Sequence, residues 1–145
     1  MTTPSVLLRA AARGLSGAMM MSAVRQATIH LGLMREPPPE TMVRGGTPAL
    51  VEELDEGTRR AVTEIAHWAY GAGGGAAYAL LPERLRRPPW AGPAYGVALW
   101  LGYELALAPL LRERHPQGRT AGRAMVALDH ALYGLVVAGR FPPRS

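Results

Sequence analysis

The chain of 145 residues contains no cysteine and no lysine. Without cysteine it forms no disulfide and has neither a thiolate nucleophile nor a zinc–thiolate site. It also lacks a Gly-x-Ser-x-Gly turn and a phosphate-binding glycine loop followed by lysine, which are common signs of hydrolases and nucleotide-binding enzymes. We therefore expect no enzymatic activity and no cofactor. The length suits a single domain over residues 1–145.

All sixteen basic residues are arginine, and the formal net charge is +5. A strongly basic balance raises the possibility of nucleic-acid binding. These arginines, however, gather at the ends of apolar segments and do not line one helix face with aromatic side chains between them. Such flanking arginine is typical of the headgroup level of membrane proteins, so we expect no nucleic-acid partner. Examples are Arg9 with Arg13, Arg59 with Arg60, and Arg112 with Arg114.

Four segments are nearly free of charge, and each has close to the ~20 residues that a helix needs to cross a bilayer. The polar faces at 3.6-residue spacing that are typical of a soluble bundle are missing. The sequence therefore predicts an all-α integral membrane bundle of four transmembrane helices, a multi-pass protein with the lipid bilayer as a partner. The predicted spans are 14–34, 61–81, 92–111 and 124–140, with an aqueous loop at 35–60.

A spaced set of residues occurs twice in the chain and indicates an internal repeat. Arg60, His67, Tyr70 and Gly71 recur 63 residues later as Arg123, His130, Tyr133 and Gly134. A weaker offset relates Gly17 and Arg25 to Gly96 and Glu104. The pattern predicts two repeated helical hairpins of parallel orientation. Small residues are expected to let the helices approach closely, and the candidates are Gly71, Gly75 and Gly134.

A few polar side chains lie inside the predicted spans, on the faces that carry the small residues. Charged groups at membrane depth are costly, so we expect them to face the interior and to pair. Depth counted from the loop side puts five of them in one layer: Arg25, His67, Glu104, Asp129 and His130. Arg25 is expected to neutralise Glu104 or Asp129, while Glu64 is expected nearer the surface.

Three interpretations of this layer are open. The favoured one is a purely structural polar network, and the second is a proton or ion pathway through the histidines and carboxylates. The third is metal binding, because Glu64 and His67 have Glu-x-x-His spacing and, with Glu104, Asp129 and His130, loosely match the sites of helical bundles that bind two irons. That match is incomplete, since Arg25 and Ala127 stand where such a site has glutamate. No metal ligand and no catalytic residue is assigned.

Three stretches resemble the YagU-like family of bacterial inner-membrane proteins: HWAYGAGGGAAYALLP at 67–82, GPAYGVALWLGYELALAPLL at 92–111 and HALYG at 130–134. The resemblance implies a multi-span protein of the inner (plasma) membrane and supplies no catalytic residues. The expected function is a structural or partner-binding role, with another membrane protein or a second copy of the chain as the partner. The alternatives are a proton or ion transporter or channel that uses the polar layer, and a metal-binding helical bundle.

Overall fold

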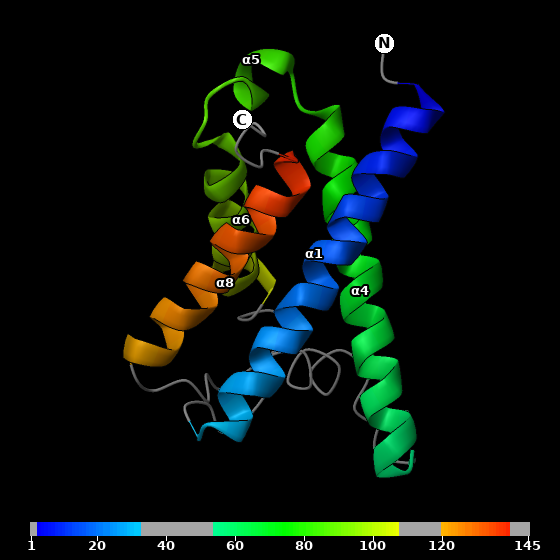
Figure 1. The fold of residues 1–145 in the computed structure, drawn as a ribbon, viewed down its shortest axis with the longest axis vertical. Coiled ribbons are helices and arrows are strands. Elements are labelled where there is room, and N and C mark those ends of the chain that lie inside the picture. Colours follow the sequence, from blue (N-terminus) through cyan, green and yellow to red (C-terminus); the bar gives the residue numbers. More distant parts are fainter. Residues whose placement is uncertain (1–2, 33–53, 108–119, 140–145) are drawn as a thin grey trace, which may run out of the picture.

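The computed structural model describes residues 3–32, 54–107 and 120–139 of the chain (Figure 1). Within these ranges the chain forms helices joined by short turns and contains no strand, so the all-α prediction is confirmed. The long elements are α1 (Pro4–His30), α4 (Glu56–Leu80), α6 (Ala91–Gly102) with its π-helical continuation η1 (Tyr103–Leu107), and α8 (Thr120–Ala138). A short helix, α5 (Glu83–Arg86), lies between α4 and α6.

Local signals explain where the first two long helices begin. Pro4 occupies the first turn of α1, where its missing N–H and fixed φ cost nothing. Asp55 caps α4, and its side chain accepts a hydrogen bond from the backbone N–H of Thr58 at 3.0 Å. α1 therefore starts well before the predicted span at 14–34, and the last residues of the predicted loop at 35–60 are helical. Residues 35–53 of that loop, and the last two residues of the predicted span, lie outside the described ranges.

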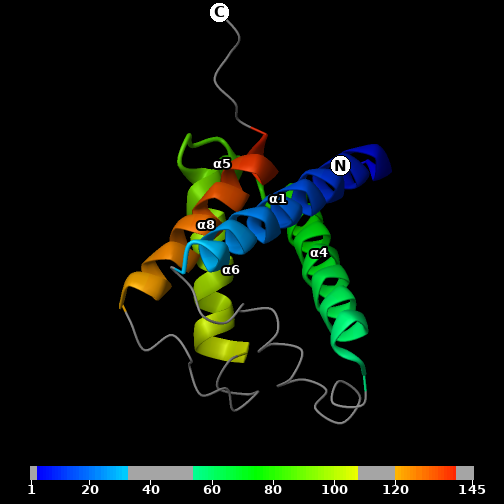
Figure 2. The same cartoon turned by 60° about the horizontal axis from the view of Figure 1, so that its bottom comes forward.

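The helices form two antiparallel pairs (Figures 1 and 2). α1 packs along α4, and α6 packs along α8. The pairs are joined mainly where α8 lies against α1, while α4 and α8 meet over a much smaller area. We refer to the contact of α8 with the α1–α4 pair as the joint. The turn that includes α5 lies at the same end of the molecule as the start of α1 (Figure 1).

Many of the buried residues are small, whereas many of the large apolar residues are exposed. A small apolar core made of Met21, Tyr78, Tyr133 and Val137 lies between the two pairs. Elsewhere the buried positions of α1 and α4 are mostly glycine, alanine or short polar residues. Many large apolar side chains are instead exposed on the outer faces of the helices. Close backbone approach, more than bulky side-chain packing, therefore holds each pair together.

The prediction of four transmembrane helices is wrong for the residues that the structure describes, because none of their helices is both long and apolar enough to cross a membrane. The predicted multi-pass localisation in a plasma membrane is wrong for the same reason. α6 is the most apolar of the four, but it ends after 12 residues and gives way to η1. α1 is longer but carries Arg9, Arg13 and Arg25. α4 consists largely of glycine and alanine, which are uncharged but only weakly hydrophobic.

Candidate functional site

A buried ion pair joins α1 to α4. Arg25 lies on the α1 face that also carries Gly14 and Ala18, and only 5% of its side chain is exposed. Its Nη2 donates to Oε1 of Glu64 on α4. A buried guanidinium without a counter-ion is strongly destabilising, so Glu64 is the group that allows Arg25 to occupy this position.

Two further side chains add hydrogen bonds around this pair. The Ser22 hydroxyl donates to Oε2 of Glu64 at 2.5 Å. It also accepts from Nη2 of Arg25 at 3.2 Å and from the indole N–H of Trp68 at 3.1 Å. Ser22 thus connects the ion pair to an aromatic side chain on the neighbouring helix. Because hydrogen bonds to charged groups are the stronger ones, this cluster helps to fix the register of α1 against α4.

Three more titratable side chains lie within electrostatic range of Arg25 or of its neighbour His67. Burial is the main influence on all of them, and Arg25 contributes to two. Burial, and then the charge of Arg25, lowers the pKa of His67 to about 4. Burial raises the pKa of Asp129 to about 6, while the attraction of Arg25 opposes that rise. Burial also lowers the pKa of His130, whose Nδ1 lies 2.9 Å from the Val126 carbonyl oxygen and must therefore be the donor.

Several polar atoms of this cluster are buried without a hydrogen-bond partner. They are Nε of Arg25, Nε2 of His67 and Oδ1 of Asp129, and they come from α1, α4 and α8 respectively. Burying a polar atom without a hydrogen bond costs free energy, and such groups are rare in native proteins. The cluster therefore combines an ion pair with buried polar atoms that lack a hydrogen bond within the described residues, and one of these atoms belongs to Arg25 itself.

The predicted polar layer is brought together only in part. Arg25, His67, Asp129 and His130 interact electrostatically across α1, α4 and α8. Glu104 belongs to a different contact, because its carboxylate lies 3.3 Å from Arg123 and links η1 to α8. The expected pairing of Arg25 with Glu104 or Asp129 therefore differs from the ion pair observed with Glu64.

The register between the antiparallel helices α1 and α4 explains why Arg25 pairs with Glu64. A Cβ on Gly14 would lie 2.9 Å from the Cα of Gly75, so these two glycines face each other. Arg25 follows Gly14 by eleven residues, and Glu64 precedes Gly75 by eleven residues. Antiparallel helices run in opposite directions at the same rise, so the two side chains reach the same level. Counting the depth of each residue from the assumed ends of the spans did not predict this register. The facing positions of Gly14 and Gly75 account for it.

The glycines predicted to pack helices lie in backbone contacts. A Cβ on Gly71 would overlap the Cβ of Ala18, and a Cβ on Gly75 would overlap the Ala10 carbonyl oxygen. On the second pair, a Cβ on Gly134 would overlap the Gly92 carbonyl oxygen. Each of these positions therefore needs a residue without a side chain for its helices to approach this closely.

The two helix pairs use equivalent contacts. Gly14 faces Gly71 and Gly75 in the first pair, and Gly92 faces Gly134 and Ala138 in the second. The α4 and α8 members differ by 63 residues, which is the offset of the sequence repeat. The α1 and α6 members differ by 78, one less than the weaker sequence offset suggested.

Tyrosine hydroxyls bind one pair to the other. Tyr133 donates to the carbonyl oxygen of Gly71 at 2.6 Å, and its ring lies against Gly17. Tyr95 donates to the carbonyl oxygen of Gly74, also at 2.6 Å. The rings of Tyr95 and Tyr78 meet edge to face with centroids 5.0 Å apart. These interactions hold the two helix pairs together at the level of Gly71 and Gly74 of α4.

The described residues provide no group of three or more histidine, aspartate or glutamate side chains that could hold a metal ion. The low-ranked metal candidates Glu64, His67, Glu104, Asp129 and His130 are therefore not assembled as a ligand set within these ranges. Glu64 and Glu104 each make an ion pair with an arginine.

No protein-family model matches the sequence, and no curated protein or solved structure is significantly similar to it. The resemblance to the YagU-like family stays a prediction.

Proposed function

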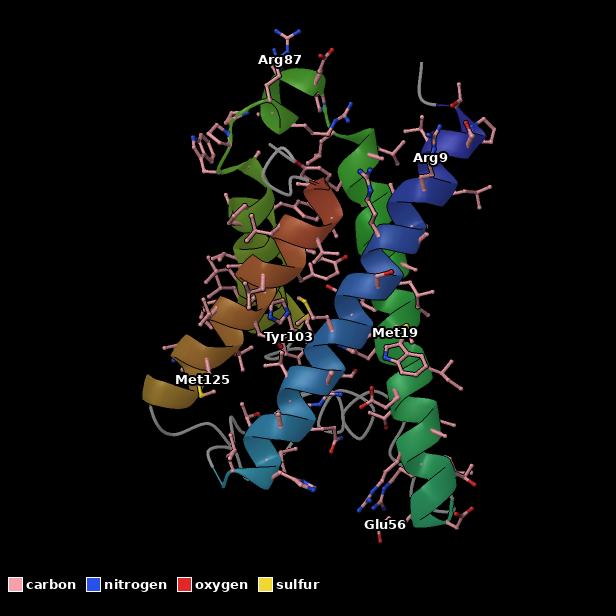
Figure 3. All side chains as sticks on the ribbon, viewed as in Figure 1. Arg9, Met19, Glu56, Arg87, Tyr103 and Met125 are labelled. Atoms are coloured by element: carbon pink, nitrogen blue, oxygen red, sulfur yellow. The ribbon has the colours of Figure 1, made fainter. Side chains whose placement is uncertain are left out.

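We propose that exposed apolar faces of the helix pairs bind a partner, and the first pair has such a face. On α1, Leu8, Leu15 and Met19 are spaced seven and four residues apart and therefore share one side of the helix. Leu8 and Ile65 of α4 are exposed to 71% and 61%. Met19 lies beside α4 on the side turned to the viewer in Figure 3. We call Leu8, Leu15, Met19 and Ile65 the α1–α4 outer face.

The second helix pair has a related face on α8. Leu128, Leu132 and Leu135 are exposed and are spaced four and three residues apart, so they form one stripe. By the repeat of 63 residues, Leu128 corresponds to Ile65. We call these three leucines the α8 outer face. Neither outer face includes a charged residue, whereas charges such as Arg9, Arg87 and Glu56 lie toward the ends of the molecule (Figure 3).

We propose that the protein is a partner-binding helical bundle and that its partner is a second copy of the same chain. The observation that carries the proposal is the inverted distribution of side chains, with glycine, alanine and the polar cluster inside and large apolar residues outside. Contiguous exposed apolar surface is typical of interaction sites. A second copy is favoured because one chain already packs two helix pairs of related sequence against each other. Two uncharged faces also meet without electrostatic repulsion.

In this proposal the chain is a duplicated helical hairpin, and the polar cluster has a structural role. The ion pair of Arg25 with Glu64 holds α1 and α4 in register, and with them the exposed residues of the α1–α4 outer face. No helix in the described ranges is both long and apolar enough to cross a membrane, so these ranges give no support to the transporter or channel alternative. A metal-binding bundle lacks a ligand group in the same ranges.

Sedimentation velocity of the purified full chain at increasing concentration tests the proposal. We expect the wild type to convert from monomer to dimer or a larger assembly as the concentration rises. Leu15→Glu with Met19→Glu should shift this conversion to higher concentration, because it places charge in the α1–α4 outer face. Leu128→Glu with Leu132→Glu tests the α8 outer face in the same way.

Val24→Glu is the matched control for the α1–α4 outer face. Val24 is also an exposed apolar residue of α1, but it lies on another side of the helix, five residues from Met19. The control variant should associate like the wild type. A wild type that stays monomeric at every concentration, or a control that dissociates as strongly as the double variants, would show that the proposal is wrong.

A further inference from the structure

Two partly buried ionisable side chains lie at the joint, and within the described residues a buried atom of each has no hydrogen-bond partner. His67 belongs to α4 and Asp129 to α8, and the unpartnered atoms are Nε2 and Oδ1. The charged and titratable groups around them are Arg25 of α1, Glu64 of α4 and His130 of α8. On the side of α6 and η1, Glu104 is paired with Arg123.

Within the described part of the chain, neither His67 nor Asp129 forms an ion pair. Arg25 and Glu64 form an ion pair and largely cancel each other. An ionised group that is buried without a partner is strongly disfavoured, so burial favours the neutral form of each residue. His67 becomes neutral by losing a proton. Asp129 becomes neutral by gaining one.

We propose that His67 and Asp129 are a proton-compensated pair, in which folding releases one proton at His67 and takes up one proton at Asp129. The proton count balances, because an imidazolium and a carboxylate in the unfolded chain become an imidazole and a carboxylic acid in the folded one. Stability depends on pH only through the difference in bound protons between the two states. Burying both groups therefore adds no net pH dependence at mildly acidic pH.

The pKa values define the range in which compensation operates. In the folded protein the pKa of His67 is about 4 and that of Asp129 about 6, so both side chains are neutral between these values. Their ordinary pKa values are 6.5 and 3.8, so both are charged in the unfolded chain over the same range. His130, whose pKa is also lowered, adds a slope in the same direction as His67. The test must therefore compare slopes with that of the wild type.

Equilibrium denaturant unfolding of the full chain between pH 4 and pH 6, the range set by these two pKa values, provides the test. Asp129→Asn leaves His67 uncompensated, so acidification should raise its unfolding constant relative to wild type by up to about tenfold per pH unit. His67→Gln leaves Asp129 uncompensated and should show the opposite change of up to about tenfold per pH unit. The double variant should return to the slope of the wild type.

Two outcomes would overturn the proposal. One is that both single variants keep the wild-type slope, and the other is that the double variant keeps the slope of one of the single variants. A direct readout on the wild type covers the case in which a variant fails to fold. At pH 5, carbon and nitrogen NMR shifts should show a neutral His67 ring and a protonated Asp129 carboxyl group. An imidazolium at His67 together with a carboxylate at Asp129 would contradict the proposal.

Discussion

The hydroxyl of Tyr133 on α8 donates a hydrogen bond of 2.6 Å to the carbonyl oxygen of Gly71 on α4, although 62 residues separate them in the chain. The ring of the same tyrosine lies against Gly17 of α1. Tyr133 thus contacts both helices of the first pair from the second one. Its sequence counterpart, Tyr70, lies on α4 and is 44% exposed. Two residues that the repeat makes equivalent therefore have different roles in the bundle.

Removing the Tyr133 hydroxyl should weaken the joint. We expect Tyr133→Phe to lower the free energy of unfolding by about 1 kcal/mol, the usual net contribution of one hydrogen bond. Tyr70→Phe is the matched control, because the described structure gives the Tyr70 hydroxyl no hydrogen bond, and its change should stay within about 0.5 kcal/mol. Urea unfolding followed by circular dichroism measures both. Equal losses in the two variants would contradict a special role for Tyr133.

Two glycines of α4 should respond to alanine in opposite directions. Gly71→Ala should destabilise by about 1–3 kcal/mol, because the new Cβ overlaps that of Ala18 and forces the helices apart. Gly73→Ala should stabilise by about 0.5–1 kcal/mol, because nothing lies within 4 Å of its Cβ position and alanine favours a helix. Thermal unfolding of the two single variants separates the effects. The same sign for both would show that Gly71 is not a packing position.

The second helix pair should behave in the same way if the equivalence of contacts is correct. Gly134→Ala is expected to destabilise like Gly71→Ala, because its Cβ would overlap the Gly92 carbonyl oxygen. Gly102→Ala serves as its open control, since a Cβ at Gly102 has no neighbour within 4 Å. Loss of stability at Gly71 alone would mean that the two pairs are held together by different forces.

Breaking the buried ion pair should cost more than breaking an exposed one. Glu64→Gln leaves the Arg25 guanidinium buried without a counter-charge, and we expect a loss of about 2 kcal/mol, reduced from the fully buried case by partial exposure of Glu64. Glu56→Gln breaks the exposed pair with Arg60 and should cost less than about 0.5 kcal/mol.

Arg25→Met combined with Glu64→Met provides a check on the cause of that loss. The double variant removes both charges, so it should be more stable than Glu64→Gln despite losing the same ion pair. A double variant as unstable as the single one would indicate that packing, and not the unpaired charge, sets the cost.

Alkaline pH should destabilise the protein through its buried tyrosines. Burial, followed by the neighbouring Tyr95 and Tyr70, raises the pKa of Tyr133 above the usual 10.0. The unfolded chain then loses this proton first, so the contribution to stability is complete below pH 10 and is lost as the pH rises further. Tyr133→Phe should make the alkaline fall in stability shallower by up to about tenfold in the unfolding constant per pH unit. Unfolding curves above pH 10 measure this difference, and an unchanged slope would contradict it.

The prediction of membrane spans was wrong for the described residues for two reasons: an uncharged segment need not be strongly apolar, and an apolar segment need not form one long α-helix. The segment at 61–81 has few charges, but glycine and alanine make it only weakly hydrophobic. The segment at 92–111 is strongly apolar, but its α-helix ends at Gly102. The length of a charge-free segment was therefore a poor predictor of whether its helix could cross a membrane. No recognised signal in the sequence predicted that α6 ends at Gly102.

The sequence by itself determined that the chain is helical, that Arg25 shares a face with Gly14, and that residues of α4 recur in α8. These features depend on local periodicity and composition, which the sequence contains directly. Only the tertiary structure decided that Arg25 pairs with Glu64 and that Tyr133, but not Tyr70, closes the joint. The physical reason is that such pairings depend on the register between helices, which is set where glycines allow two backbones to come into contact.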